Sequence, residues 1–349
     1  MRIMLCLAGA AHGGAETFFV DLSAAFARAG VEIFPVIRPN AVRQSALRRL
    51  GAPVRTAPYG KWLDARTGAI LRRAVREVEP DVVLAFMNRA AAWMPGGDHV
   101  KAARLGGYYD LKYYQRCRHL LCITPAIRRH ALAAGWPAGR AHVLPNFATV
   151  DRYLPEDRGN LDTPRDAPVL LVPSRLHHNK GLDVLLRALV QVPRAVCWLA
   201  GDGPAHGALV RLAAELGVSD RVRFLGWRAD KGALYRAADV VVFPSRYEPF
   251  GTVSLEAWAY ERPLVTTDAD GPAGLVAPES DALMVPREDP DALAAAIRRV
   301  LDEPRLATRL VAAGRMRYDR DYTEAACVAR YLDLFGRLIG QADAAREIA

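Results

Sequence analysis

The chain has 349 residues, of which 51% are hydrophobic and 24% are charged, and its formal net charge is +9. This length suits two folded cores better than one, and the apolar content excludes a disordered protein. No apolar run reaches the roughly 18 residues that a membrane-spanning helix needs. Ile3–Ala11 resembles the core of a signal peptide. A glycine-rich turn and an amphipathic helix follow it directly, which favours a buried first strand.

Strand and helix signals alternate through the first 150 residues, and this order is typical of parallel sheets. Glycine or proline follows most of the periodic runs and sets their ends. In chain order we expect a strand at Arg2–Leu7, a helix at Ala15–Ala29, a strand at Glu32–Ile37, helices at Arg43–Leu50 and Thr67–Val78, strands at Asp81–Phe86 and Leu120–Thr124, a helix at Ala126–Ala134 and a strand at Arg140–Leu144.

The segment Asp151–Ala167 is polar and contains prolines, which predicts a linker. A second alternating series follows it. Its expected strands are Val169–Pro173, Ala195–Ala200, Val222–Leu225, Val240–Pro244 and Pro263–Thr267, and its expected helices are Leu182–Leu189, Gly207–Leu216, Lys231–Ala237, Thr252–Tyr260, Asp291–Asp302 and Pro304–Arg320. Such alternation requires right-handed crossovers. The sequence therefore predicts an α/β fold of two Rossmann-like domains, with parallel sheets facing across a cleft.

Charge and cysteine usage restrict the partners. Residues 1–150 carry 21 Lys and Arg against 9 Asp and Glu, a net charge of +12, and the remainder carries −3. A basic first half favours an anionic partner such as phospholipid or a phosphorylated glycolipid, although an arginine-rich solvated surface explains it equally well. No nucleic-acid-binding motif is visible.

The five cysteines form no C-x-x-C pair, which favours reduced thiols over metal or disulfide frameworks.

The most informative segment is Ser245–Ala259, which places Glu248 and Glu256 on either side of a Pro-Phe-Gly turn. It follows a buried strand and enters a helix, so both carboxylates lie near the edge where α/β sheets bind ligands. The first-turn amides of the helix suit a phosphate, and carboxylates accept hydrogen bonds from sugar hydroxyls. The segment therefore predicts a nucleotide-sugar site.

This segment resembles the E-x7-E motif of retaining glycosyltransferases of the GT-B fold, family 4 (glycosyl transferases group 1). The similarity extends over about residues 1 to 340. Further matching segments are Gly13–Glu16 (GGAE), Leu144–Asn146 (LPN), Pro173–Gly181 (PSRLHHNKG), Gly201–Pro204 (GDGP) and Leu225–Trp227 (LGW).

The resemblance implies an acceptor-binding domain at residues 1–150, completed by a crossover helix at 323–340, and a nucleotide-sugar-binding domain at residues 168–322. Arg175 and Lys180 would hold the donor diphosphate and stabilise its charge as it departs. Glu256 would bind the ribose and Glu248 the transferred sugar. The remaining donor-binding positions implied by the resemblance are Gly13, Gly14, Phe250, Gly251, Thr252 and Val253.

The chain departs from the family pattern at three places. Many relatives carry a histidine where Leu105–Tyr113 offers Tyr108, Tyr109 and Asp110, and we take Asp110 as the acceptor-side catalytic candidate. The junction has Phe147 where glycine is usual, and the loop after Thr267 has Gly274 where glutamate is frequent.

We expect no cofactor and no metal. Asp268 and Asp270 mimic a D-x-D motif but follow the nucleotide-binding helix, and the adjacent His177 and His178 diverge too much to bind zinc together. His12 precedes the glycine-rich loop and could reach an acceptor, although a single histidine near a loop is more often incidental. Five aromatic residues lie in the basic half of the chain: Trp62, Tyr108, Tyr109, Tyr113 and Tyr114. They could form a sugar-stacking or membrane-interface surface, or they could be ordinary, partly buried side chains.

The expected partners are a nucleotide-sugar donor, with UDP favoured over GDP, and a glycan or lipid-linked acceptor of lipopolysaccharide or cell-surface polysaccharide synthesis. The expected location is cytoplasmic, with or without contact to the inner face of the membrane. Alternatives are a nucleotide-sugar epimerase on the same fold and a non-catalytic sugar- or lipid-binding protein. A glycosidase with paired carboxylates fits poorly with two nucleotide-type domains, and an oxidoreductase lacks its G-x-G-x-x-G signature.

Overall fold

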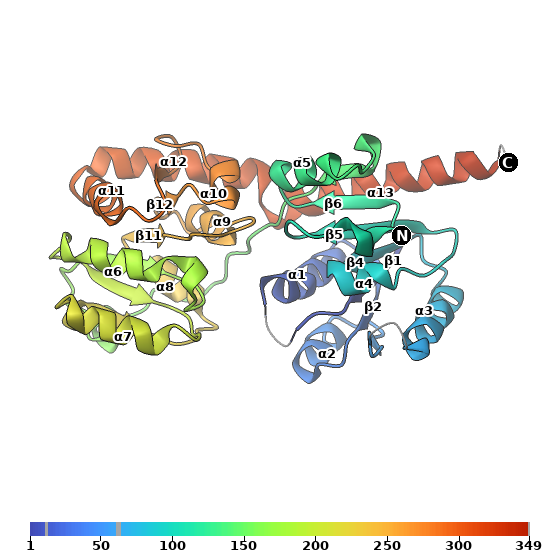
Figure 1. Cartoon of the computed structure of the whole chain (residues 1–349), viewed down its shortest axis with the longest axis horizontal. Coiled ribbons are helices and arrows are strands. Elements are labelled where there is room, and N and C mark those ends of the chain that lie inside the picture. Colours follow the sequence, from blue (N-terminus) through green and yellow to red (C-terminus); the bar gives the residue numbers. More distant parts are fainter. Residues whose placement is uncertain (11–12, 61–63, 348–349) are drawn as a thin grey trace. The chain divides into compact units, whose positions relative to one another are not determined.

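The computed structural model describes residues 1–10, 13–60 and 64–347, which form two compact units (Figure 1). Unit 1 contains Met1–Asn146 and Glu324–Ala349, and unit 2 contains Phe147–Thr323. Each unit is built on one parallel sheet, so the predicted fold class of two Rossmann-like α/β domains is confirmed. His12 and Trp62, singled out from the sequence, lie outside the described residues.

The sheet of unit 1 has seven strands in the order β3-β2-β1-β4-β5-β6-β7, all paired in parallel. Its strands are β1 (Arg2–Leu7), β2 (Glu32–Ile37), β3 (Arg55–Thr56), β4 (Val82–Phe86), β5 (Val100–Leu105), β6 (His119–Cys122) and β7 (Ala141–Val143). Its helices are α1 (Gly14–Arg28), α2 (Ala41–Arg48), α3 (Ala65–Val78), α4 (Met87–Ala92), η1 (Leu111–Tyr114), α5 (Pro125–Ala133), η2 (Ala138–Arg140) and α13 (Glu324–Glu347).

The sheet of unit 2 has six parallel strands in the order β10-β9-β8-β11-β12-β13. Its strands are β8 (Val169–Val172), β9 (Val196–Leu199), β10 (Val222–Phe224), β11 (Val240–Phe243), β12 (Leu264–Thr267) and β13 (Leu283–Val285). Its helices are η3 (Arg158–Leu161), η4 (His178–Lys180), α6 (Leu182–Val190), α7 (His206–Glu215), η5 (Ser219–Arg221), α8 (Lys231–Ala237), α9 (Thr252–Ala259), α10 (Asp270–Leu275), α11 (Pro290–Asp302) and α12 (Pro304–Asp321).

Strand β5 lies between β4 and β6, yet the sequence analysis did not predict it. Its residues, VKAARL, are buried except for Lys101, and Arg104 is only 3% exposed. The Arg104 guanidinium lies 4.5 Å from the centre of the Phe18 ring and donates a hydrogen bond to Asn146 Oδ1. Burial lowers the pKa of Arg104. The segment was not predicted to be a central strand because it contains two cations within six residues, and charged residues are rare in such strands.

The segment predicted to be a linker is packed against unit 2, so that prediction was wrong. Glu156 N donates to Ala233 O at 3.0 Å, and Arg158 Nη2 donates to Ala237 O at 2.7 Å. Further along, the Trp198 indole N–H donates to Thr163 Oγ1 at 2.9 Å. The polar side chains of this segment satisfy hydrogen bonds of the fold rather than interacting with solvent alone.

The prediction also missed β3, α4, β13 and α10, which are among the shortest elements of the chain. All five cysteines are buried and free, and burial raises the pKa of the Cys6 and Cys197 thiols to about 12. Within the described ranges, no helix is long and apolar enough to cross a membrane.

Helix α12 contacts α9 at Gly314. A Cβ atom added there would lie 2.2 Å from Trp258 Cδ1. Trp258 is 1% exposed and its indole N–H donates to Asp281 O at 2.9 Å, so the ring cannot move aside. By contrast, Gly336 in α13 is exposed, and nothing lies within 4 Å of its added Cβ.

We therefore expect Gly314→Ala to lower the free energy of unfolding by about 1–3 kcal/mol, because it overpacks a fixed contact. The matched change Gly336→Ala should raise it by about 0.5–1 kcal/mol, because alanine favours a helix. Chemical denaturation of both variants measures this difference. Equal effects at the two glycines would contradict the packing shown here.

Two histidines on neighbouring strands form a pair in a basic environment. His119 Nδ1 and His142 Nε2 are 3.2 Å apart. Burial, followed by the charges of His142, Arg118 and Arg140, lowers the pKa of His119 to about 4. Burial, followed by the charges of Arg337 and Arg128, also lowers the pKa of His142. Both rings are therefore neutral in the folded protein at neutral pH.

A lowered histidine pKa makes stability fall as the pH falls. The contribution of neutral His119 to the free energy of unfolding should be fully present above pH 6.5 and should be lost as the pH falls towards 4. The expected change is about 3 kcal/mol. Unfolding free energies measured across this range should fall more steeply for the native chain than for His119→Gln. Identical pH dependence in the two proteins would show that this pair does not titrate as described.

Candidate functional site

Both sheets reverse their strand order at one point, and the predicted site residues follow the strands at these points. In unit 2 the order reverses between β8 and β11, and in unit 1 between β1 and β4. The crossovers on either side of such a point run in opposite directions, which leaves the carboxyl ends of the two strands open to ligands. Arg175 and Lys180 follow β8, Glu248 follows β11, and Gly13 and Gly14 follow β1.

In unit 2 the loops after β8 and β11 lie against each other. Asn179 O accepts hydrogen bonds from Arg246 N at 2.8 Å and from Tyr247 N at 3.2 Å. Gly181 has a φ of 61°, and an added Cβ would lie 2.0 Å from Pro244 O. Only glycine fits this position, because it needs both a left-handed backbone and the space of a missing side chain.

The structure brings Lys180 and Glu248 together. Lys180 Nζ lies 2.6 Å from Glu248 Oε2, and the two side chains are only 23% and 16% exposed. The second carboxylate oxygen, Oε1, accepts a long contact of 3.5 Å from Phe250 N. The cation and the carboxylate that the resemblance assigns to diphosphate and sugar thus form one part-buried ion pair, 68 residues apart in sequence.

Arg246 fixes the start of the loop that carries Glu248. Its guanidinium donates to both Asp183 oxygens, at 2.6 and 2.7 Å, and to Glu288 Oε2 at 2.8 Å. The hydrogen bonds to Asp183 and then Glu288 raise the pKa of Arg246. Arg246 was not predicted as a site residue, because nothing in the motif indicates that its partners lie 63 and 42 residues away.

Helix α10 supports the other end of the same loop. Gly271 N donates to Glu248 O at 2.7 Å, and a Cβ on Gly271 would lie 2.5 Å from Phe250 N. This stretch was predicted to be a loop, which was wrong.

The helix that follows the Glu248 loop begins beside α10. Gly251 has a φ of 95° and precedes α9, whose first turn includes Thr252 and Val253. First-turn amides have no acceptor within a helix and can donate to an anion.

Glu256 is 6% exposed, as its apolar neighbours in the sequence predicted. Its Oε2 accepts a hydrogen bond of 2.6 Å from the Tyr235 hydroxyl, and its Oε1 accepts from Lys231 Nζ. Burial and the Glu256 charge raise the pKa of Tyr235 well above its usual range. The sequence places Lys231 and Tyr235 one helical turn apart but contains no sign that they face Glu256, so both were missed.

Arg175 is exposed in the turn after β8. The GDGP segment supports this turn from behind, since a Cβ on Gly201 would lie 2.0 Å from Ser174 O and one on Gly203 would lie 2.3 Å from Leu176 O. Leu176 N also donates to Asp202 O at 3.0 Å. These two glycines therefore permit close backbone approach beneath the exposed cation.

In unit 1 the glycine-rich loop accommodates a carboxylate. Glu16 is 6% exposed, and its Oε1 accepts from Ala10 N at 2.7 Å. A Cβ on Gly13 would lie 2.3 Å from Glu16 Oε2. Gly13 has an extended backbone with a φ of 167°, which any residue can adopt, so its missing side chain matters here for space rather than for backbone conformation. Gly14 has open space around its added Cβ.

Asp110 lies in the exposed loop after β5 and caps η1. Its carboxylate accepts from Lys112 N at 3.0 Å and pairs with Lys112 Nζ at 2.7 Å. These hydrogen bonds lower the pKa of Asp110. Nearby, Tyr114 is buried and donates to Asn88 Oδ1 at 2.8 Å, so it does not belong to the predicted aromatic surface.

The metal-like patterns of the sequence have other partners. Asp268 Oδ1 accepts from Arg287 N at 2.9 Å and from Arg287 Nε at 3.0 Å. His177 Nδ1 accepts from Asn179 N at 3.2 Å. In the described ranges, no group of three or more His, Cys, Asp or Glu side chains is arranged to hold a metal ion.

Comparison with known proteins identifies relatives over nearly the whole chain. A family described as Glycosyl transferases group 1 matches residues 155–317, and Glycosyltransferase Family 4 matches residues 12–152. The chain is 39% identical to the lipopolysaccharide core biosynthesis glycosyltransferase LpsD of Rhizobium meliloti (strain 1021), over 93% of this chain and 96% of that protein. It is 35% identical to LpsE of the same organism, over 92% and 95%.

Among solved structures, Anabaena Alr3699/HepE in complex with UDP and glucose superposes with a TM-score of 0.83. The aligned region covers 96% of this chain and 99% of that one, at 20% sequence identity. This likeness supports the two-domain fold described above.

The Tyr235–Glu256 hydrogen bond predicts a measurable loss of stability. Tyr235→Phe removes the donor from a buried carboxylate oxygen, which should lower the free energy of unfolding by about 1–3 kcal/mol. Tyr153→Phe, at a tyrosine that is 52% exposed, should change it by less than about 0.5 kcal/mol. Urea denaturation compares the two, and an unchanged midpoint for Tyr235→Phe would contradict the expected cost.

Proposed function

This chain belongs to the glycosyltransferases of group 1 and family 4 and is a transferase enzyme, and on that premise we propose its donor, acceptor and mechanism. The donor is a UDP-sugar and the acceptor is a hydroxyl of a lipopolysaccharide core glycolipid. The Lys180–Glu248 ion pair at the reversal point of unit 2 carries the proposal, because it places a cation and a hydroxyl-binding carboxylate in contact.

The diphosphate binds between the cations and the start of α9. Lys180 is held by its loop contacts and supplies a point charge, while the exposed Arg175 can bind oxygens bidentately. The amides of Gly251, Thr252 and Val253 add donors at the positive end of α9. We propose that these two cations, rather than a metal ion, neutralise the negative charge that develops on the departing phosphate.

The two carboxylates bind hydroxyl groups. Glu256, held by Tyr235 and Lys231, accepts hydrogen bonds from the ribose hydroxyls. Glu248 accepts from hydroxyls of the transferred sugar, and its contact with Lys180 keeps that carboxylate oriented. Tyr235 and Lys231 are positioning residues in this scheme, because they act on the nucleotide through Glu256.

The transfer retains the configuration of the sugar. The bond between the anomeric carbon and the phosphate oxygen breaks, and its electron pair leaves with UDP. The acceptor oxygen bonds to the anomeric carbon on the same face, and its proton passes to the departing phosphate oxygen. The resemblance to retaining enzymes supports this route as a proposal, in which Arg175 and Lys180 supply the charge stabilisation that such a step requires.

The acceptor binds to unit 1. LpsD and LpsE, which share 39% and 35% of their aligned residues with this chain, are described as enzymes of lipopolysaccharide core biosynthesis. The net charge of +12 on residues 1–150 favours an anionic glycolipid at the cytoplasmic face of a membrane. Asp110 remains our candidate for the acceptor-side catalytic residue.

A thermal-shift panel of UDP, GDP, ADP and their common sugar conjugates tests the donor assignment. UDP should raise the melting temperature, because a ligand at 100 times its Kd stabilises the folded state by about 2.7 kcal/mol. Lys180→Ala should abolish this shift. Arg194→Ala removes an exposed cation at the opposite, amino-terminal edge of the same sheet and should retain the shift.

Two outcomes would contradict the proposal. A shift with GDP or ADP but none with UDP would reject the UDP assignment. A UDP shift of equal size in Lys180→Ala and the native chain would place the nucleotide elsewhere. The melting temperature of each variant without ligand serves as the folding control.

A further inference from the structure

One stretch of unit 1 is free of acidic residues. Between Glu32 and Asp64 the sequence has no Asp or Glu but six Arg or Lys residues, so nearly a tenth of the chain carries one sign of charge. Helix α2 lies in the middle of this stretch and contributes Arg43 and Arg48, with Arg49 at its carboxyl end. A surface of one sign attracts groups of the opposite charge.

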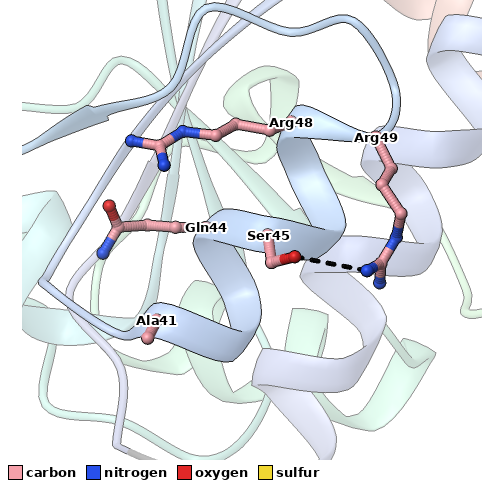
Figure 2. A pocket seen from close by; sticks show the side chains of 5 residues that line it. All are labelled: Ala41, Gln44, Ser45, Arg48 and Arg49. Carbon is pink, nitrogen blue, oxygen red and sulfur yellow. Dashed lines mark hydrogen bonds between the residues drawn. The ribbon is translucent and has the colours of Figure 1, made fainter.

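Helix α2 separates its arginines between two faces. Arg43 and Leu47 are buried, and Arg43 Nη2 donates to Ala10 O at 2.9 Å in the glycine-rich loop. The opposite face is hollowed into an open depression of about 420 Å³ (Figure 2). We call it the α2 groove, and it is lined by Ala41, Gln44, Ser45, Arg48 and Arg49.

The two sides of the α2 groove carry hydrogen-bond donors. Figure 2 shows Gln44 and Arg48 extending on one side of the helix, with Ser45 and Arg49 on the other. Arg49 Nη1 donates to Ser45 Oγ at 3.2 Å, which leaves the serine O–H able to donate in turn. No lining residue is acidic. Arg48 forms no ion pair within the described part of unit 1, so its guanidinium is available for a ligand.

This set of groups fits a phosphate better than a neutral sugar. Guanidinium groups match the geometry of phosphate oxygens and bind them bidentately, and their charge-assisted hydrogen bonds are stronger than neutral ones. The Gln44 amide and the Ser45 hydroxyl can add further donors. A neutral sugar would leave two guanidinium charges without a counter-charge.

The position of the α2 groove connects it to the site of unit 1. Helix α2 follows β2, begins with the cap of Asn40 on Arg43 N at 2.9 Å, and contacts the loop after β1 through Arg43. At about 1.5 Å per residue, Arg48 lies roughly 7.5 Å along the helix from Arg43. Because the groove is on the face opposite Arg43, an acceptor with a phosphate in the groove must extend around α2 to bring a hydroxyl near the glycine-rich loop.

We propose that the α2 groove binds a phosphate group carried by the acceptor glycolipid and so selects phosphorylated acceptors. This inference rests on the proposed function, since it assigns an acceptor feature to unit 1. It adds a site in α2 that is separate from the donor residues of unit 2. The groove recognises the phosphate, and the carbohydrate around it extends towards the loop after β1.

The test measures binding of the full chain to micelles of rough lipopolysaccharide, either intact or dephosphorylated, and to phosphatidylglycerol vesicles. The double variant Arg48→Gln/Arg49→Gln removes both charges but keeps hydrogen-bonding side chains of similar length. The matched control, Arg72→Gln/Arg76→Gln, removes the same charge from exposed positions of α3 in the same unit. Thermal melts confirm that both variants fold.

We expect intact lipopolysaccharide to bind the native chain and the α3 control with equal affinity. It should bind the α2 variant at least about tenfold more weakly, because the loss of one charge-assisted contact has an effect of this size. Dephosphorylation should remove this difference. Equal losses in both variants would overturn the proposal in favour of diffuse surface charge. Binding to phosphatidylglycerol with the same dependence on α2 would overturn it in favour of a general membrane contact, and no binding would also overturn it.

The experiment distinguishes this inference from the proposed function. The UDP thermal shift depends on Lys180 in unit 2, so the α2 variant should retain it in full. Loss of lipopolysaccharide binding with an intact UDP shift supports the groove. An intact UDP shift with unchanged lipopolysaccharide binding in the α2 variant rejects the groove and leaves the donor assignment standing.

Discussion

The reversal of strand order in each parallel sheet is the constraint on which the rest of this structure depends. Right-handed crossovers cannot cover both strands at a reversal, so the carboxyl ends of β8 and β11 stay open. The loops that leave these two strands carry Lys180 and Glu248, and their ion pair joins the loops. The same constraint in unit 1 leaves the glycine-rich loop after β1 open.

Close backbone approach makes that arrangement rigid. Gly181, Gly201 and Gly271 each let one loop lie directly against the backbone of another, where a Cβ atom would meet a carbonyl oxygen or an amide nitrogen. Arg246 then ties the Glu248 loop to two carboxylates from other elements. Preorganised charges stabilise a transition state more effectively than mobile ones, because they need not reorganise during the reaction.

The two units use their charges differently. In unit 2 three cations of the site form ion pairs, Lys180 with Glu248, Arg246 with Asp183, and Lys231 with Glu256, whereas Arg175 is exposed. In unit 1 the stretch around α2 has no acids at all, and Arg48 faces outward. Internal pairing fixes the geometry of a site, whereas an outward cation is available for an external anion. This division fits a donor site built in advance and an acceptor site that recognises charge.

The sequence alone determined the strand–helix alternation, the two-domain α/β fold and the positions of Lys180, Glu248 and Glu256, because these features depend on local periodicity and on spacing within loops. Only the tertiary structure decided the rest. Strand β5 was hidden because its buried Arg104 finds partners far away in sequence. The partners of Glu256, the support from Arg246 and the steric reason for Gly13 likewise depend on contacts between segments that periodicity cannot pair.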